Sequence, residues 1–113
     1  MLLTGDIERQ AEGELLARNA AAVAADVLLV PHHGSRTSST AEFLRAVGAQ
    51  AEVIPVGYRN RFRHPSAEVL ERLGMRPMRT DLDGAVSVAL SQDKLEIQGE
   101  RRRRRRYWQD APP

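Results

Sequence analysis

Cysteine is absent from the 113 residues of this chain, and histidine occurs only three times. The absence of cysteine excludes disulfides and zinc–thiolate sites, so histidine and carboxylate side chains would have to bind any metal. The sequence has no apolar run near the ~18 residues that a membrane-spanning helix requires, and nothing in it predicts a signal peptide. Aromatic residues make up 4% of the chain, so we expect alanine, leucine and valine to fill most of the core.

Positive charge is concentrated at one end of the chain. The whole sequence contains 17 Lys+Arg and 15 Asp+Glu. Six of the basic residues form the run Arg101–Arg106, and one acidic residue, Asp110, follows it, so residues 1–100 have 11 basic and 14 acidic residues and a net charge of −3. We therefore expect two parts, a mildly acidic domain of residues 1–100 and an arginine-rich tail of residues 101–113 without stable structure.

Strand-like and helix-like segments alternate through the first 100 residues. Apolar runs and alternating patterns predict strands, and apolar residues at 3/4 spacing predict helices. We expect strands at 1–4, 26–30, 51–56, 75–80, 85–91 and 94–100, and helices at 8–23, 39–47 and 65–73. Pro55 suggests that the third of these strands lies at an edge. This order predicts an α/β fold with a mixed sheet and three helices.

Three groups of polar residues follow successive predicted strands. They are Asp6, the adjacent pair His32 and His33, and His64. Ligands of open α/β sheets gather at the carboxyl ends of strands, so these side chains would converge if the strands are neighbours. Taken alone, Asp6 is more typical of a turn and His64 is more typical of a helix cap. The prediction of a site at this edge of the sheet therefore depends on the three groups together.

The histidine pair opens the polar stretch His-His-Gly-Ser, which suits an anion such as phosphate. Gly34 permits close approach of a ligand, and Ser35 offers a hydroxyl and a backbone N–H group. Arg61, in the loop before His64, could bind a phosphate or belong to an ordinary solvated loop. A histidine here could donate a proton to a leaving oxygen. Consecutive side chains of an extended segment point in opposite directions, so the pattern does not choose between His32 and His33.

Four segments together resemble a known family. In chain order they are LLTGD, DVLLVPHHGSRTSS, HPSAEVLERL and RTDLDGAVSV. They are similar to the carboxy-terminal part of the metallo-β-lactamase-like domain in the ComEC family of DNA internalisation competence proteins. The similarity runs from Leu2 to about Leu90 and implies that residues 1–100 form the second half of a metallo-β-lactamase αβ/βα sandwich.

The resemblance also implies a site and a function. Asp6 matches the family's metal-bridging aspartate, His64 matches its late metal-ligand histidine, and His32 or His33 matches the histidine that meets the substrate phosphate. The implied cofactor is a divalent metal, zinc or manganese, in a two-metal site that activates water and clamps the scissile phosphate. The implied parent is a bacterial inner-membrane protein that takes up single-stranded DNA, with this soluble part belonging to a nuclease domain.

The sequence departs from the family in one important respect. The early HxxxDH cluster, which supplies most of the metal ligands, has no counterpart here, whereas a catalytic zinc normally needs three protein ligands. We therefore expect this chain alone to be inactive and to need the missing amino-terminal half of the domain and the membrane channel of the parent. A half-sandwich would also leave one sheet face uncovered and open to self-association.

Two other functions are compatible with the sequence. The chain could be a non-catalytic nucleic-acid-binding module, in which Arg101, Arg102, Arg103, Arg104, Arg105 and Arg106 neutralise phosphates beside two aromatic residues. It could also be a folded remnant without chemistry of its own. Metal and nucleic-acid binding by the chain would separate these hypotheses from the first.

Overall fold

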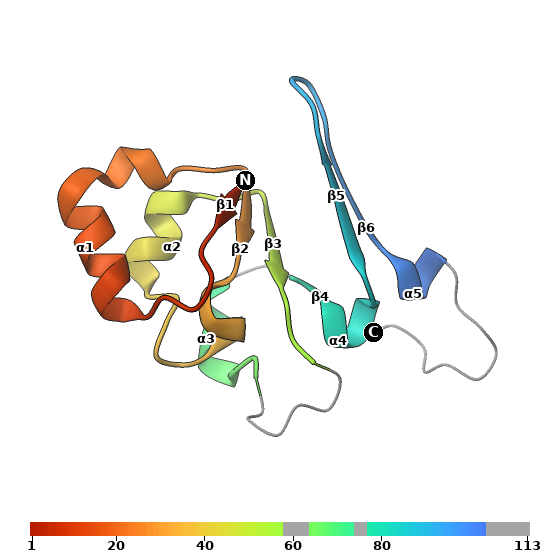
Figure 1. The fold of residues 1–113 in the computed structure, drawn as a ribbon, viewed down its shortest axis with the longest axis horizontal. Helices are drawn as coiled ribbons and strands as arrows, with labels where there is room; N and C mark the ends of the chain where they lie inside the picture. The colour runs from red at the N-terminus through yellow and green to blue at the C-terminus, as the bar shows by residue number, and fades with distance from the viewer. Residues whose placement is uncertain (58–63, 74–76, 104–113) are drawn as a thin grey trace.

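The computed structural model describes residues 1–57, 64–73 and 77–103 of the chain (Figure 1). Four parallel strands form one sheet in the order β1-β2-β3-β4, and two antiparallel strands form a separate hairpin. The strands are β1 (Leu2–Leu3), β2 (Val27–Leu29), β3 (Ala51–Ile54), β4 (Met78–Arg79), β5 (Val86–Leu90) and β6 (Leu95–Gly99). The chain is therefore an α/β protein, as the sequence predicted, but its parallel and antiparallel strands form two separate sheets and not the one mixed sheet that we expected.

Helices connect the parallel strands. They are α1 (Arg9–Asn19), α2 (Ala41–Val47) and α3 (Ala67–Leu73), with one-turn helices α4 (Thr80–Asp83) and α5 (Glu100–Arg103) on either side of the hairpin. Two 3-10 segments, η1 (Ala20–Val23) and η2 (Pro31–Gly34), precede and follow β2. Because the strand order follows the chain order and such crossovers are right-handed, α1, α2 and α3 cover the same face of the sheet.

The core lies between that face and the helices. Leu28 of β2 packs with Phe43 and Val47 of α2 in one cluster, and Ile54 of β3 packs with Val69 of α3 in a second. Leu28 and Val27 are both buried, which explains why β2 reads in the sequence as a continuous apolar run. This packing fixes the carboxyl ends of β1, β2 and β3, from which the site is built.

The opposite face of the sheet is covered at Val27 and Val53 and exposed at its β1 edge. Leu3, at the edge strand β1, has 69% of its surface exposed, and Leu90 of the hairpin has 45%. Figure 1 shows the hairpin extending away from the four-stranded sheet rather than folding over it. This arrangement leaves apolar surface open, and self-association through it stays a prediction.

Several sequence-based boundaries are corrected by the structure. β3 lies between β2 and β4 rather than at an edge, and it ends at Ile54, so Pro55 falls outside the hydrogen-bonded ladder. The first helix ends at Asn19 and not at the expected residue 23, and its Leu15 is exposed. Part of the tail that we expected to lack structure, Arg101–Arg103, belongs to α5, whereas residues 104–113 lie outside the described part.

Two aspartates near the end of the parallel sheet have structural contacts. The carboxylate of Asp81 accepts two hydrogen bonds from the Arg79 guanidinium, at 3.0 and 2.7 Å. Asp83 is fully buried and its Oδ2 accepts a hydrogen bond from the Arg79 backbone N–H at 2.8 Å. Gly99 must be glycine because a Cβ there would lie 2.8 Å from the Asp83 side chain. These contacts join β4 to the hairpin.

Glu52 of β3 is a carboxyl group buried on the helix-covered face. It pairs in register with Leu28, is 8% exposed, and its Oε2 has no hydrogen-bond partner among the described residues. Burial raises the pKa of Glu52 from 4.5 to about 7. Because the folded chain holds this proton more tightly than the unfolded chain, stability falls as the pH rises from about 4.5 to 7 and stays lower above that range.

We expect Glu52→Gln to raise the free energy of unfolding by about 2 kcal/mol at pH 8 and to change it little at pH 4.5. The pKa shift is worth about 3 kcal/mol, and desolvation of the new amide offsets part of it. Urea unfolding at the two pH values measures the difference. The exposed Glu96 gives a matched control in Glu96→Gln, and an effect of Glu52→Gln that is equal at both pH values would contradict this account.

Candidate functional site

The polar groups that follow the first three parallel strands line one open pocket of about 450 Å³. Its lining residues are Asp6 after β1, His32 and His33 in η2 after β2, and His64 before α3. The ring centroids of His32 and His33 are 6.3 Å apart, and that of His64 lies 6.0 Å from the first and 6.4 Å from the second. The structure thus brings together the four side chains that the sequence placed at one edge of the sheet.

An unusual backbone turn directs both adjacent histidines into this pocket. His32 (φ 49°, ψ 44°) and His33 (φ 55°, ψ 23°) are both left-handed, which is unfavourable for residues with a side chain. Backbone hydrogen bonds hold the turn, from the His32 N–H to the Gly5 carbonyl at 2.8 Å and from the Ser35 N–H to the His32 carbonyl at 2.9 Å. An extended segment would have separated the two rings.

His33 has a defined tautomer. Its Nδ1 lies 2.7 Å from the carbonyl oxygen of Pro55, which can only accept, so Nδ1 is the protonated nitrogen. Nε2 therefore has a lone pair in the neutral ring and an N–H in the charged ring, and it lies 3.5 Å from Oδ1 of Asp6. Nearly half of the His33 side chain is exposed, so this nitrogen is accessible to a ligand.

His32 has a different partner, which the sequence did not indicate. Its Nδ1 lies 3.1 Å from Oε1 of Glu8, close enough for an ion pair but without the alignment of a hydrogen bond. Glu8 follows Asp6 by two residues in the same segment, and that spacing was the one available signal of its position. The two histidines thus differ, because His32 faces Glu8 whereas His33 faces Asp6.

His64 is held in its neutral form. Burial lowers the pKa of His64 below its usual value of 6.5, and the nearby His32 and His33 lower it further. A neutral imidazole can bind a metal or accept a hydrogen bond, whereas the protonated ring can do neither.

The residues of this pocket do not by themselves form a metal site. Among residues 1–57, 64–73 and 77–103, no group of three or more histidine, aspartate and glutamate side chains is arranged to hold a metal ion. A catalytic zinc needs three protein ligands and an open position. The roles of Asp6 and His64 as metal ligands therefore stay predictions that require further ligands.

The other residues that the sequence assigned to phosphate binding do not line the histidine pocket in the described part of the chain. Neither Gly34 nor Ser35 lines the histidine pocket, and the Ser35 hydroxyl lies 3.1 Å from that of Thr37, within the loop. Gly34 packs against Pro65, where a Cβ would come within 2.5 Å of the proline Cβ. Gly34 therefore joins the His32–His33 turn to the His64 segment. Arg61 lies outside the described residues.

A buried glutamate clamps the loop that follows the histidines. Glu12 of α1 is fully buried, and its carboxylate accepts hydrogen bonds from the backbone N–H groups of Ser39 at 2.6 Å and Thr40 at 2.8 Å. The N-cap of α2 is Thr40, whose side-chain oxygen accepts a hydrogen bond from the Phe43 N–H at 3.3 Å. Nothing in the sequence singled out Glu12, because an isolated glutamate on a helix usually faces solvent.

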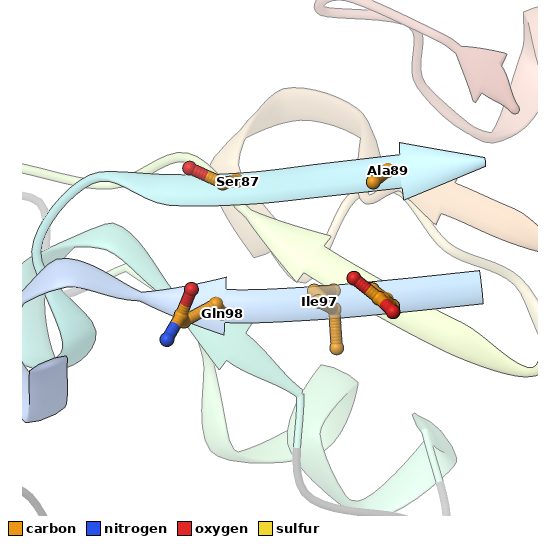
Figure 2. Close-up of a pocket in the computed structure, with 5 residues that line it drawn as sticks. Ser87, Ala89, Ile97 and Gln98 are labelled. Atoms are coloured by element: carbon orange, nitrogen blue, oxygen red, sulfur yellow. The ribbon is translucent and has the colours of Figure 1, made fainter.

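The hairpin has a hollow of its own on its exposed face, with a volume of about 310 Å³ (Figure 2). It is lined by Ser87, Ala89, Glu96, Ile97 and Gln98. Glu96 alone among these side chains is ionisable, so the hollow offers no cluster of reactive groups, and the histidine pocket remains the candidate site.

Comparison with known proteins places the chain among proteins of genetic competence. It is 36% identical to Competence protein ComA of Neisseria gonorrhoeae over 99% of this chain and 16% of that protein. It is 38% identical to ComE operon protein 3 of Bacillus subtilis over 75% of this chain and 11% of the relative. It is 39% identical to Recombination protein 2 of Haemophilus influenzae over 87% of this chain and 12% of the relative. No family model and no solved structure matches the chain.

These similarities define the chain as a relative of competence proteins. More particularly, it is related to a segment of the ComEC family, as the motifs around Asp6, His32–His33 and His64 predicted. The chain spans between about a tenth and a sixth of the length of the relatives it matches. In the described part of the chain, no helix has both the length and the apolar character needed to cross a bilayer.

Proposed function

We propose that this chain supplies the histidine-lined wall of a phosphodiesterase site in a DNA-uptake protein. The observation that carries the proposal is the convergence of three histidine rings and Asp6 in one pocket, with His33 presenting Nε2. The relationship to competence proteins supports DNA as the substrate class. In this proposal the fold is the second half of a metallo-β-lactamase sandwich.

His33 would act as the proton donor of this site. Protonated His33 holds one proton on Nδ1, toward Pro55, and the other on Nε2, beside Asp6. Hydrolysis adds water across a P–O bond, and the proton on Nε2 would pass to the leaving oxygen as that bond breaks. Asp6 would help to orient the ring through its contact with Nε2, and the ring would regain its proton from solvent. His32, turned toward Glu8, would shape the pocket instead.

The proposal includes a divalent metal, zinc or manganese, only in a longer protein. Asp6 and His64 would be this chain's contribution to its binding, and the remaining ligands would come from residues outside this sequence. The metal would supply charge at the phosphate. For the same reason we propose that the chain is inactive by itself, and that its partners are single-stranded DNA, the rest of the domain and a membrane channel in the parent.

The test is a hybrid in which this chain replaces the matching segment of the Neisseria gonorrhoeae relative. We expect the purified hybrid to hydrolyse a dinucleotide and to lose this activity when a chelator removes the metal. The His33→Ala substitution should slow hydrolysis about 100-fold, which is the size of effect expected when a general acid is lost. A 4-nitrophenyl phosphodiester needs little protonation of its leaving group, so its hydrolysis should fall much less.

The matched control is Arg45→Ala, on the exposed surface of α2, which should leave both rates unchanged. Undiminished dinucleotide hydrolysis by the His33→Ala hybrid would exclude the proposed proton donor. An equal loss with both substrates would also exclude it, because a proton donor matters most for the poor leaving group.

A further inference from the structure

A second pocket, of about 250 Å³, shares no residue with the histidine pocket and is rich in arginine. Its lining residues are Arg9, Arg36, Thr37, Thr40, Ala41, Glu42 and Arg72. They come from the start of α1, from the loop between η2 and α2, from the first turn of α2 and from α3. Three guanidinium groups and one carboxylate give the pocket a net positive charge, which suits an anion with several oxygen atoms.

The three arginines are not equivalent. Arg72 is held in place, since its Nη1 donates to the carbonyl oxygens of Ser38 at 3.4 Å and Ser39 at 3.2 Å, and its Nη2 lies 3.6 Å from Glu68. In contrast, the guanidinium groups of Arg9 and Arg36 make no ion pair or hydrogen bond within the described residues. Two charged groups are thus available to a ligand.

Backbone hydrogen bonds hold the segments around this pocket, and several N–H groups there are already occupied. The Arg9 N–H donates to the Thr37 carbonyl at 3.0 Å, which ties the start of α1 to the loop. The N–H groups of Ser39 and Thr40 already donate to the buried Glu12 carboxylate. Attraction for an anion therefore comes from the arginine side chains and not from the end of α2.

Two stretches of chain lead from the histidine pocket to the arginine pocket. Asp6 precedes Arg9 by three residues, and His33 precedes Arg36 by three residues. Three residues span at most about 11 Å between Cα atoms, so the two pockets are neighbours on the surface. Neighbouring phosphates of an extended nucleic-acid strand lie within this range, because a strand has one phosphate for about every 3.4 Å of helix rise.

We propose that the arginine pocket binds a backbone phosphate of a nucleic-acid strand while another phosphate of the same strand occupies the histidine pocket. The inference rests on the proposed function and deepens it, because it gives the site a preference for polynucleotides over small phosphodiesters. Arg9 and Arg36 are the residues that determine this preference. They neutralise phosphate charge without contacting bases, so binding is independent of base sequence.

The test compares Arg9→Gln/Arg36→Gln with the control Arg18→Gln/Arg45→Gln in the full chain. The control removes two exposed arginines that do not line the pocket, and every variant keeps Arg101–Arg106. Fluorescence anisotropy with a labelled ten-nucleotide single strand gives Kd over a range of salt concentrations. For the pocket variant we expect Kd to rise about tenfold at low salt and the slope of log Kd against log salt to fall by about 0.7, because one phosphate contact is lost.

Equal slopes for the pocket variant and its control would overturn the inference, and so would the absence of strand binding by the unmodified chain. Dinucleotide hydrolysis by the hybrid protein is a separate measurement. If the Arg9→Gln/Arg36→Gln variant binds the strand as well as its control does, the inference fails, but the loss of hydrolysis expected for His33→Ala is not affected. If the His33→Ala hybrid hydrolyses the dinucleotide at the normal rate, the proposed function fails instead. The two failures are therefore distinguishable. Circular dichroism before each titration verifies that the variants are folded.

Discussion

Glu12→Ala should lower the free energy of unfolding by about 4 kcal/mol. The side chain is fully buried, and its carboxylate accepts two charge-assisted hydrogen bonds from Ser39 and Thr40. Removing it leaves two backbone N–H groups without partners, and hydrogen bonds to charged groups are worth about 1.5–3 kcal/mol each. Ser39 also has a left-handed backbone (φ 58°), which costs energy unless its surroundings hold it. Urea unfolding followed by circular dichroism measures the loss.

Glu14→Ala is the matched control for this prediction, because Glu14 lies on the same helix but is exposed. We expect it to change stability by less than about 0.5 kcal/mol, as surface substitutions usually do. Similar losses for the two variants would contradict the role of Glu12 as a clamp on the loop.

Gly34→Ala should cost about 3 kcal/mol and disturb the histidine pocket. Gly34 has φ 79°, a conformation that costs an L-residue about 1–2 kcal/mol. The added Cβ would also lie 2.5 Å from Cβ and 3.0 Å from Cα of Pro65, so the two segments would have to separate. Overpacking of this kind costs about 1–3 kcal/mol. The Ser66 N–H donates to the Gly34 carbonyl at 2.9 Å, and this bond would be strained as well.

Gly13→Ala makes the same chemical change, but we expect it to raise the free energy of unfolding instead of lowering it. Gly13 lies inside α1, and a Cβ there would meet nothing within 4 Å. Alanine should therefore stabilise the chain by about 0.5–1 kcal/mol through helix propensity. If Gly34→Ala were as well tolerated as Gly13→Ala, the close packing of the histidine turn against Pro65 would be wrong.

The order of elements was predictable because the hydrophobic pattern reports burial directly. Val27 and Leu28 are buried on opposite faces of β2, and an unbroken apolar run follows from that. The edge position assigned from Pro55 was wrong because the strand ends one residue earlier, where proline removes no ladder bond. Leu16 of α1 packs against the core, but the buried side chain of this helix is Glu12, which a hydrophobic pattern cannot identify.

The positions of the site residues were predictable in part. Parallel strands bring their carboxyl ends to one edge, so Asp6, His33 and His64 could be expected to converge from chain order alone. The left-handed turn at His32 and His33 could not, because it depends on hydrogen bonds from segments distant in sequence. The arginine pocket likewise joins α1, a loop and α3, and its three arginines lie far apart in the chain.

The most direct test of the central claim records the imidazole nitrogen signals of the three histidines by nuclear magnetic resonance during titration of the full chain with a dinucleotide. If His33 and His64 belong to one phosphate-binding pocket, their signals should shift together and saturate at one dinucleotide per chain, and the His64 signal should stop shifting in Asp6→Asn/His33→Ala. Histidine signals that stay fixed while signals of the arginines move would contradict the account, because the phosphate would then bind elsewhere on the chain.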